Sequence, residues 1–248
     1  MNNIATHPPG SCLSQNQLLA AMNTKDQKLI LPHLEWMPLV QHDVLFYDES
    51  AIIAVHFPIS GVVSMAAVMP DGDMCEIGII GKEGFTGVPV VLGDPWAVHQ
   101  SMVQVTGEAL RIRSSKLQSL CRESGTLHAV LLRYVNVQNR LLAQGMACNA
   151  LHSAEQRLSR WMLLLADRMG SEVLRITHEF LSMMIGSRRA TVTIIADMLQ
   201  NTGVIALRRG EVRILDRPRL EKVACGCYSK MRNMIERLNF APHALAQM

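Results

Sequence analysis

The chain has 248 residues, of which 49% are hydrophobic, and carries a formal net charge of +3. At about 150 residues per domain, this length favours two domains rather than one. Residues 1–150 contain 9 basic and 12 acidic residues, whereas residues 151–248 contain 15 and 9. A basic C-terminal third beside a mildly acidic remainder is typical of a nucleic-acid-binding module attached to another domain.

The spacing of the six cysteines argues against a zinc finger and against a disulfide-stabilised secreted domain. None forms a C-x-x-C pair, and their spacing fits neither a zinc finger nor the disulfide framework of a secreted domain. The only close pair is Cys225-Gly226-Cys227, which we interpret as two incidental reduced thiols, with a redox or metal role as the alternative. The sequence therefore predicts no metal site and no cofactor, and it leaves the role of Cys225 and Cys227 open.

The cellular location that we expect for the protein rests on two segments, the N-terminal residues and the uncharged residues 51–70. Residues 1–10 have neither a charged n-region nor an apolar h-region, so no export signal is visible. Residues 51–70 lack charge, but Pro58, Gly61 and His56 interrupt them. This run is typical of two strands around a turn rather than a membrane span. We expect a cytoplasmic protein without a membrane partner.

The first half of the chain predicts a helix followed by many short strands. Residues 1–14 have the composition of a flexible tail, and residues 15–34 form an amphipathic helical pattern. Short apolar runs then follow at Val44–Tyr47, Ile52–Phe57, Gly61–Met69, Cys75–Ile80, Val88–Leu92 and Met102–Ile112. Asp71-Gly72 is a strong hairpin signal. Regular short strands of this kind predict an antiparallel β-barrel or jelly roll.

A long helix begins near Leu127 and shows a coiled-coil-like apolar stripe. The stripe consists of Leu127, Val130, Tyr134, Val137 and Leu141 and continues to Leu151. Two interpretations remain open, a seam between two copies and a single core helix packed on the barrel. A neighbouring stripe of Leu131, Val135 and Leu142 could dock on the barrel. We therefore expect a homodimer through the first stripe, followed by a further helix over residues 155–169.

Residues 174–200 predict a strand and a helix-turn-helix. A short strand, Leu174–Ile176, precedes the N-cap residue Thr177 and a helix over 178–184. Gly186 permits the sharp corner before a second helix over 188–200. The residues expected to face inward from the second helix are Val192, Ile195, Ala196 and Leu199. Those on the opposite face are Ala190, Thr193, Ile194 and Asp197.

A small hairpin over residues 204–215 follows, with Arg208-Arg209-Gly210-Glu211 at its tip. A helix-turn-helix with an arginine-tipped wing is typical of DNA reading, although a plain helical hairpin with a β-ribbon remains an alternative. The candidate DNA-contacting residues are Ser187, Arg188, Arg189, Thr191, Thr193, Arg208, Arg209 and Arg213. Residues 218–238 add further basic helix.

The order of helix, small barrel, long helix and winged helix-turn-helix resembles the Crp/Fnr family of bacterial transcription regulators. The resemblance runs from about Val40 to Leu215, and its most specific segments are residues 57–63, 78–87 and 185–192. It implies an α+β fold with a cyclic-nucleotide-binding-like barrel (1–124), a dimerisation helix (125–152) and a winged helix-turn-helix domain (153–248). It also implies a homodimer on a two-fold operator in double-stranded DNA, RNA polymerase as a partner, and no enzymatic activity.

The resemblance places Arg189 on the arginine that reads guanine in this family. The frequent glutamate of the family is here Ala190, and its second helix arginine is here Ile194. The operator should therefore differ from the best-known operators of the family. Our hypothesis is that Ala190 and Ile194 contact apolar surface such as thymine methyl groups.

The sensor half departs further from the family. Its ligand turn corresponds to Gly84, Phe85, Thr86, Gly87 and Val88, so the ribose-binding glutamate has become Val88. The later phosphate-binding pair falls at His99-Gln100, and the sequence has no arginine between Lys82 and Arg111. We expect an effector pocket at these seven residues that does not take cyclic AMP, with an unknown small-molecule effector.

Two other sensing chemistries are not favoured by the sequence. The family's iron–sulfur members use clustered N-terminal cysteines, whereas Cys12 stands alone ahead of Cys75. Haem ligation is possible in principle, but His42, His56 and His99 read as ordinary surface or strand histidines.

The sequence thus predicts a sequence-specific DNA-binding regulator. The alternative is a ligand-gated interaction module whose winged domain binds protein. An enzyme finds little support because no catalytic triad order, metal-ligand set or phosphate loop stands out. Whether transcription rises or falls, and at which operator and genes, is left open.

Overall fold

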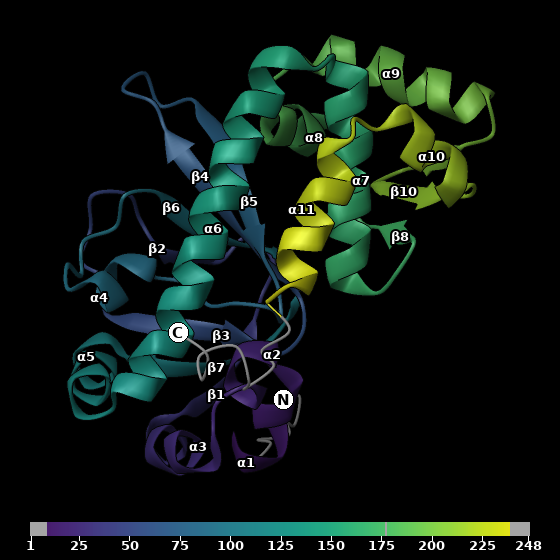
Figure 1. The fold of residues 1–248 in the computed structure, drawn as a ribbon. Helices are drawn as coiled ribbons and strands as arrows, with labels where there is room; N and C mark the ends of the chain where they lie inside the picture. Colours follow the sequence, from purple (N-terminus) through teal and green to yellow (C-terminus); the bar gives the residue numbers. More distant parts are fainter. Residues whose placement is uncertain (1–8, 177, 239–248) are drawn as a thin grey trace, which may run out of the picture.

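The computed structural model describes residues 9–176 and 178–238 and consists of a barrel and a winged domain joined by a long helix (Figure 1). The long helix is α6 (Gly125–Leu151). Of the predicted N-terminal tail, residues 1–8 lie outside the described part. Residues 9–14 are helical, with α1 (Pro9–Cys12) followed by the 3₁₀ turn Leu13–Gln15.

The prediction of a single helix over residues 15–34 is wrong, because a new helix begins after each of two asparagines, Asn16 and Asn23. Asn16 accepts hydrogen bonds from the backbone N–H of Leu18 and Leu19, both at 3.1 Å, and caps α2 (Gln17–Ala20). Asn23 caps α3 (Thr24–Ile30) in the same way, and a 3₁₀ turn, Leu31–His33, follows. The Asn16 amide also donates to the carbonyls of Pro58 and Gly84, both at 2.9 Å. These hydrogen bonds hold the start of α2 against the barrel.

Two antiparallel sheets form the barrel, which confirms the predicted jelly-roll-like class. One sheet has the order β1 (Glu35–Leu39), β7 (Gly107–Arg113) and β3 (Ala54–Pro58). The other has the order β2 (Val44–Phe46), β6 (Gln100–Val105), β4 (Val62–Val68) and β5 (Met74–Ile80). The predicted hairpin joins β4 to β5, and Gly72 takes a φ of 89° in its turn.

Two of the predicted strands differ in the structure. The run Met102–Ile112 is split between β6 and β7, because Gly107 approaches the backbone of Ser60 so closely that a Cβ would lie 2.4 Å from the Ser60 oxygen. The run Val88–Leu92 is helix α4, not a strand. Its β-branched residues favour a strand, but Pro89 in the first turn and left-handed glycines at both ends favour a short helix.

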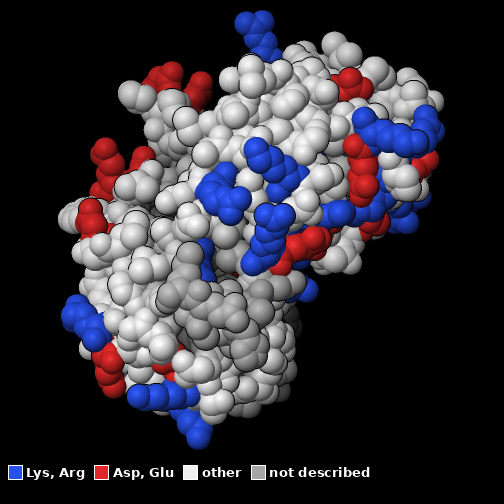
Figure 2. Space-filling model, viewed as in Figure 1, with Lys and Arg blue, Asp and Glu red and all other residues white. Residues whose placement is uncertain are grey.

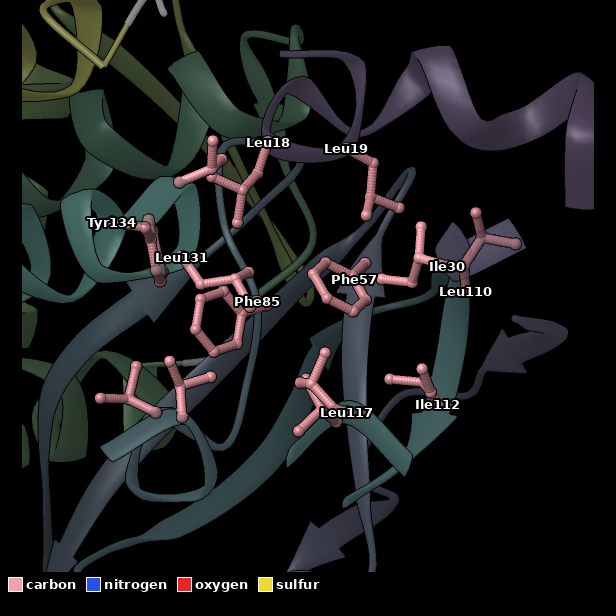
Figure 3. Packing of buried hydrophobic residues seen from close by; sticks show 14 of the residues in the cluster. Leu18, Leu19, Ile30, Phe57, Phe85, Leu110, Ile112, Leu117, Leu131 and Tyr134 are labelled. Carbon is pink, nitrogen blue, oxygen red and sulfur yellow. The ribbon is translucent and has the colours of Figure 1, made fainter. Parts of the chain in front are cut away.

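A cluster of aromatic side chains joins α6 to the centre of the barrel (Figure 3). The ring of Phe85 lies 5.6 Å from that of Phe57 and 5.0 Å from that of Tyr134, centroid to centroid. All three side chains are buried, together with Leu131 from α6. Aromatic pairs at this spacing contribute about 0.5–1.5 kcal/mol beyond their buried area.

The barrel also covers the stripe that the sequence predicted as a dimer seam. Leu127, Val130, Tyr134 and Val137 are buried in the barrel core, and Leu141 is half-buried against it. Both apolar stripes of α6 therefore pack within one chain, because the barrel is wide enough to cover both. The large apolar side chains that α6 leaves exposed lie on its outer face and are Leu132, Met146 and Leu151.

The winged domain begins one residue after the end of α6. Ser153 caps α7 (Ala154–Met169) with a capping box that includes Gln156. The elements that follow are α8 (His178–Ile185) and α9 (Arg189–Asn201), with a sheet of order β8 (Val173–Leu174), β10 (Glu211–Ile214) and β9 (Ile205–Arg208). The predicted helix-turn-helix and wing are present. The predicted cap Thr177 lies outside the described residues.

The remaining helices are α5 (Ser114–Glu123), α10 (Arg217–Val223) and α11 (Cys227–Glu236). Helix α11 packs against both α6 and α7 and so holds the winged domain beside the long helix (Figure 1). Among the described helices, none has the length and apolar character needed to cross a membrane.

Gly84 is the position where the packing of α6 on the barrel tolerates least change. A Cβ at residue 84 would lie about 2.1 Å from the ring of Tyr134, which is buried and cannot move aside. We expect Gly84→Ala to lower the free energy of unfolding by about 1–3 kcal/mol, as overpacking does elsewhere. Urea unfolding followed by circular dichroism measures this change.

Gly125→Ala is the matched control, because its added methyl group would meet nothing within 4 Å. Equal stability of the two variants would contradict the tight approach of α6 to the barrel.

Candidate nucleic-acid interface

Helix α9 is amphipathic, with its inner face packed in the winged domain. The buried residues Val192, Ile195, Ala196 and Leu199 confirm the predicted 3–4 spacing. Arg188, Arg189 and Ala190 are exposed at its start. Arg188 takes an extended conformation at the N-cap, and its side chain makes no capping hydrogen bond. The first-turn N–H groups of α9 are therefore directed toward any anion that approaches this end.

Two predicted DNA-contacting residues, Ser187 and Thr193, form hydrogen bonds with other residues of the winged domain. Ser187 accepts a hydrogen bond from Arg157 Nη2 at 3.2 Å, and Thr193 donates to the carbonyl of Arg189 at 3.1 Å. Thr191 is half-buried. The two exposed arginines are thus more accessible than the hydroxyl residues around them.

The wing presents three further arginines. Arg208 and Arg209 are exposed at the hairpin tip, where Gly210 takes a φ of 72°. Arg213 lies 3.5 Å from Glu211, with half of its side chain exposed. Such surface pairs contribute little, so Arg213 can exchange Glu211 for a phosphate at small cost.

Arg217, by contrast, has a structural role. Its guanidinium donates to Glu172 at 2.7 Å, to the Tyr228 hydroxyl at 2.8 Å and to Asp167. It therefore ties α10 and α11 to α7. This multiple pairing distinguishes Arg217 from the arginines available to a ligand.

Two buried polar links connect the barrel to α7. Trp161 Nε1 donates to Glu76 Oε1 at 2.6 Å, and Ser64 donates to Glu76 Oε2 at 2.8 Å. Arg168 Nε lies 2.8 Å from Glu83 Oε1, and both side chains are 7% exposed. Burial raises the pKa of Glu76 to about 8, despite these hydrogen bonds. Neither link could be predicted from a local sequence pattern, because the two partners of each are 85 residues apart.

The β4–β5 hairpin lies against the corner of the helix-turn-helix. Asp73 and Arg188 line the same surface hollow, and a Cβ at Gly186 would lie 3.3 Å from Cys75 Sγ. Acidic side chains mark the edge where this hairpin projects, whereas basic side chains gather over α11 and the neighbouring part of α6 (Figure 2). The barrel therefore contacts the winged domain beside the start of α9.

The predicted effector residues are packed inside the barrel. Phe85 and Thr86 are fully buried, and Thr86 Oγ1 is hydrogen-bonded to His56 Nδ1 at 3.1 Å. The rest of the set comprises Gly84, which lies against Tyr134, Gly87 and Val88 at the start of α4, the buried His99, and Gln100 at the start of β6.

The histidines in this region cannot replace the missing phosphate-binding arginine. Burial lowers the pKa of His56 to about 4 and also lowers the pKa of His99. Both rings are therefore neutral near pH 7. Neither ring would therefore supply a positive charge to an anionic phosphate. The positive charge near His56 belongs to Arg111, which is paired with Glu35 at 2.8 Å.

A small cavity lies elsewhere, between β5, α6 and α7. Its volume is about 70 Å³, and its lining includes Glu76, Gln138, Trp161 and Arg168 but none of the seven predicted effector residues. Small-molecule sites usually have about 300 Å³ or more, so this junction would have to open to admit a ligand.

Comparison with known proteins agrees with this architecture. The sequence profile of the Crp-like helix-turn-helix domain matches residues 156–223. Among solved structures, a protein described as a Crp/Fnr-family transcriptional regulator from Eubacterium rectale aligns with a TM-score of 0.68 at 17% identity, covering 83% of this chain and 96% of that one. No curated protein sequence matches the chain.

Two further structures align over most of their length. The c-di-GMP-responsive regulator CLP of Xanthomonas campestris has a TM-score of 0.65 at 17% identity, covering 77% of this chain and 99% of its own. FixK2 of Bradyrhizobium japonicum has a TM-score of 0.65 at 11% identity, covering 78% and 98%. The chain therefore has the Crp/Fnr fold with a Crp-like helix-turn-helix domain. The proteins that define this fold and domain are transcriptional regulators, not enzymes.

The contact between Glu76 and Trp161 predicts a pH dependence of stability. The folded state keeps the Glu76 proton up to about pH 8, whereas an ordinary Glu releases it near 4.5. The stability contributed by this group is therefore fully present below pH 4.5 and is lost as the pH rises to about 8. Glu76→Gln keeps an acceptor for Trp161 and cannot ionise, so its advantage over the wild type should grow across this range. Urea unfolding at pH 5 and pH 8 measures the difference.

Glu123→Gln at the exposed end of α5 is the control, and it should not change with pH relative to the wild type. A constant difference between Glu76→Gln and the wild type would contradict a neutral, buried Glu76.

Proposed function

We propose that the protein is a sequence-specific DNA-binding transcription regulator that acts in the cytoplasm as a homodimer on a two-fold operator. The observation that carries this proposal is the exposed pair Arg188 and Arg189 at the start of a helix whose opposite face is fully packed. A helix held in this way can enter the major groove with its N-terminal residues against base edges.

Five exposed side chains of α9, its N-cap and the wing have assigned tasks in this proposal. Arg189 reads guanine through its O6 and N7 atoms, because a guanidinium matches this pair of acceptors. Arg188 binds phosphate, as do Arg208 and Arg209 on the wing. Ile194, which is 70% exposed, contacts apolar surface in the groove such as a thymine methyl group.

A second copy would bind along the outer face of α6. Met146 is 75% exposed and Leu151 is 80% exposed, and Ala143, Ala147 and Ala150 are exposed on the same part of the helix. Small residues allow two helices to approach closely, while Met and Leu supply apolar area. In this proposal the chain divides into a barrel domain (1–124), a dimerisation helix (125–152) and a winged helix-turn-helix domain (153–248). The DNA-bound homodimer would have RNA polymerase as a partner.

The sensor would act through the buried junction with α7. A ligand that binds the barrel can shift the winged domain only if its affinity differs between the two arrangements. The links from Glu76 to Trp161 and from Glu83 to Arg168 are the contacts that such a shift would break. The buried effector residues and neutral histidines argue against cyclic AMP as this ligand.

Selection of random duplex DNA by the purified protein, without added effector, tests the proposal. Enrichment of a palindrome with half-sites about 10 base pairs apart would support a dimeric reader. Its affinity should also fall steeply with salt, because several phosphates are neutralised. A folded protein that enriches no sequence, with or without cell extract as a source of effector, would favour a protein-binding module.

The first variant to test is Arg189→Ala. Loss of a bidentate guanine contact should cost about 1–3 kcal/mol of binding free energy and remove the preference for one base pair in each half-site. Repeating the selection with the variant measures both effects. An unchanged operator preference would exclude Arg189 as a base-reading residue.

Two comparisons make this test specific. Arg209→Ala should weaken binding to all sequences similarly and reduce the salt slope by about 1. Arg122→Ala, an exposed arginine on α5, should change neither.

The dimer is tested by Met146→Glu. A charge at the centre of the proposed interface must be desolvated on association, so we expect the variant to be monomeric in analytical ultracentrifugation with an unchanged circular dichroism spectrum. Val98→Glu, at a barrel residue that is 72% exposed, should remain dimeric. A dimeric Met146→Glu variant would place the interface elsewhere.

A further inference from the structure

Four side chains with metal-binding atoms meet where the long helix ends. They are Cys148 on α6, His152 at its C-cap, Cys225 between α10 and α11, and Cys227 at the start of α11. Their ligand atoms all lie within 4.8 Å of one another. The Sγ atoms of Cys148 and Cys225 are 3.4 Å apart, and Cys227 Sγ is 3.7 Å from His152 Nδ1.

We propose that these residues form a Cys₃His site for a single Zn²⁺ ion that joins α6 to the winged domain. Three sulfurs and one imidazole nitrogen are a ligand set that zinc prefers in closed, structural sites. A tetrahedral ion with zinc–sulfur bonds of about 2.3 Å separates its sulfurs by about 3.8 Å and a sulfur from a nitrogen by about 3.6 Å. The two separations given above differ from these values by 0.4 Å or less, and no pair of ligand atoms is more than 4.8 Å apart, so small side-chain adjustments would complete the tetrahedron.

Local backbone structure brings the four ligands together. Cys148 and His152 are four residues apart, and the His152 N–H still donates to the Cys148 carbonyl at 3.0 Å, so both lie on one side of the end of α6. Cys225 and Cys227 flank Gly226, the residue before the first turn of α11. Packing of α11 against α6 then brings the two pairs into contact.

The surroundings of the cluster suit bound thiolates. Cys148, Cys225 and Cys227 are all buried, whereas His152 is half-buried and leaves a path for the ion. The side-chain amide of Gln144 donates to Cys227 Sγ at 3.1 Å, as outer-shell groups do around zinc ligands. Three thiolates and Zn²⁺ carry a net charge of −1, and Arg160 supplies a neighbouring positive charge.

Protons compete with the ion for the sulfur atoms of the cluster. Burial raises the pKa of Cys148 to about 12. Binding of Zn²⁺ therefore has to displace the thiol protons, which a coordinating dication does readily. An iron–sulfur cluster fits less well, because its thiolates bind separate iron atoms and are held further apart by the cluster core.

The position of the site gives it a consequence for the fold. His152 and Ser153 form the corner between α6 and the winged domain, and the cysteine pair follows the segment that resembles the Crp-like domain. An ion at this corner would hold the winged domain in one orientation relative to α6. This consequence is independent of whether the winged domain binds DNA.

The first experiment measures metal in the full-length wild-type protein. Protein purified with reductant and without chelator should contain one zinc per chain by elemental analysis. After removal of the metal, titration with Co²⁺ should give the visible absorption of a tetrahedral, thiolate-bound ion, saturating at one equivalent. Calorimetry in two buffers of different ionisation enthalpy should show that binding releases protons.

Variants then identify the ligands. Cys225→Ser and His152→Ala should each weaken Co²⁺ binding by more than about 100-fold, because even outer-shell partners of zinc ligands account for about 10–100-fold. His152 is half-buried, so His152→Ala tests the site even if Cys225→Ser fails to fold. Cys121→Ser, a cysteine on α5 outside the cluster, should bind Co²⁺ as the wild type does.

Three results would overturn the proposal. The first is a reduced, folded wild-type protein that binds neither Zn²⁺ nor Co²⁺, which would leave a packed thiol cluster. The second is a Cys148–Cys225 disulfide in protein isolated without reductant, together with failure of the reduced form to bind metal. The third is several irons with inorganic sulfide in place of one zinc.

Discussion

The burial of one helix, α6, in two different cores is the constraint on which the structure depends. Its first half fills the barrel through Tyr134 and Leu131, whereas its second half packs against β5 and α11, and Leu141 contacts both cores. Protein interiors are close-packed, so a shift of the barrel end must be taken up along the helix or at its far end. Because of this packing, α6 couples the position of the winged domain to that of the barrel.

The polar contacts across the junction differ in kind from this apolar packing. The ion pair of Glu83 with Arg168 and the hydrogen bond from Trp161 to Glu76 are buried, so each is costly to leave unpaired. Apolar surfaces can slide over one another at little cost, but these donors and acceptors match in one arrangement only. They therefore favour discrete positions of the winged domain over a continuous range.

The sequence predicted best where local rules act alone. The inward face of α9 follows from the spacing of Val192, Ile195 and Leu199, and the β4–β5 turn follows from Asp71-Gly72. Prediction failed where tertiary contacts decide. A valine-rich run became α4, and the stripe assigned to a dimer seam was covered by the chain's own barrel, since periodicity shows that a face is buried but not what buries it.

The cysteines illustrate the same limit for a candidate site. Cys225 and Cys227 are visible as a pair in the sequence, but spacing alone could not show that Cys148 and His152 lie beside them. What brings them together is the return of α11 along α6, which no local signal encodes. The buried contacts at Glu76 and the thiol cluster at His152 border the winged domain on two sides, one from the barrel and one from the end of α6. A domain held at two separate places can rotate only when one of them is released, so the cluster would determine how much of a movement of the barrel reaches α9.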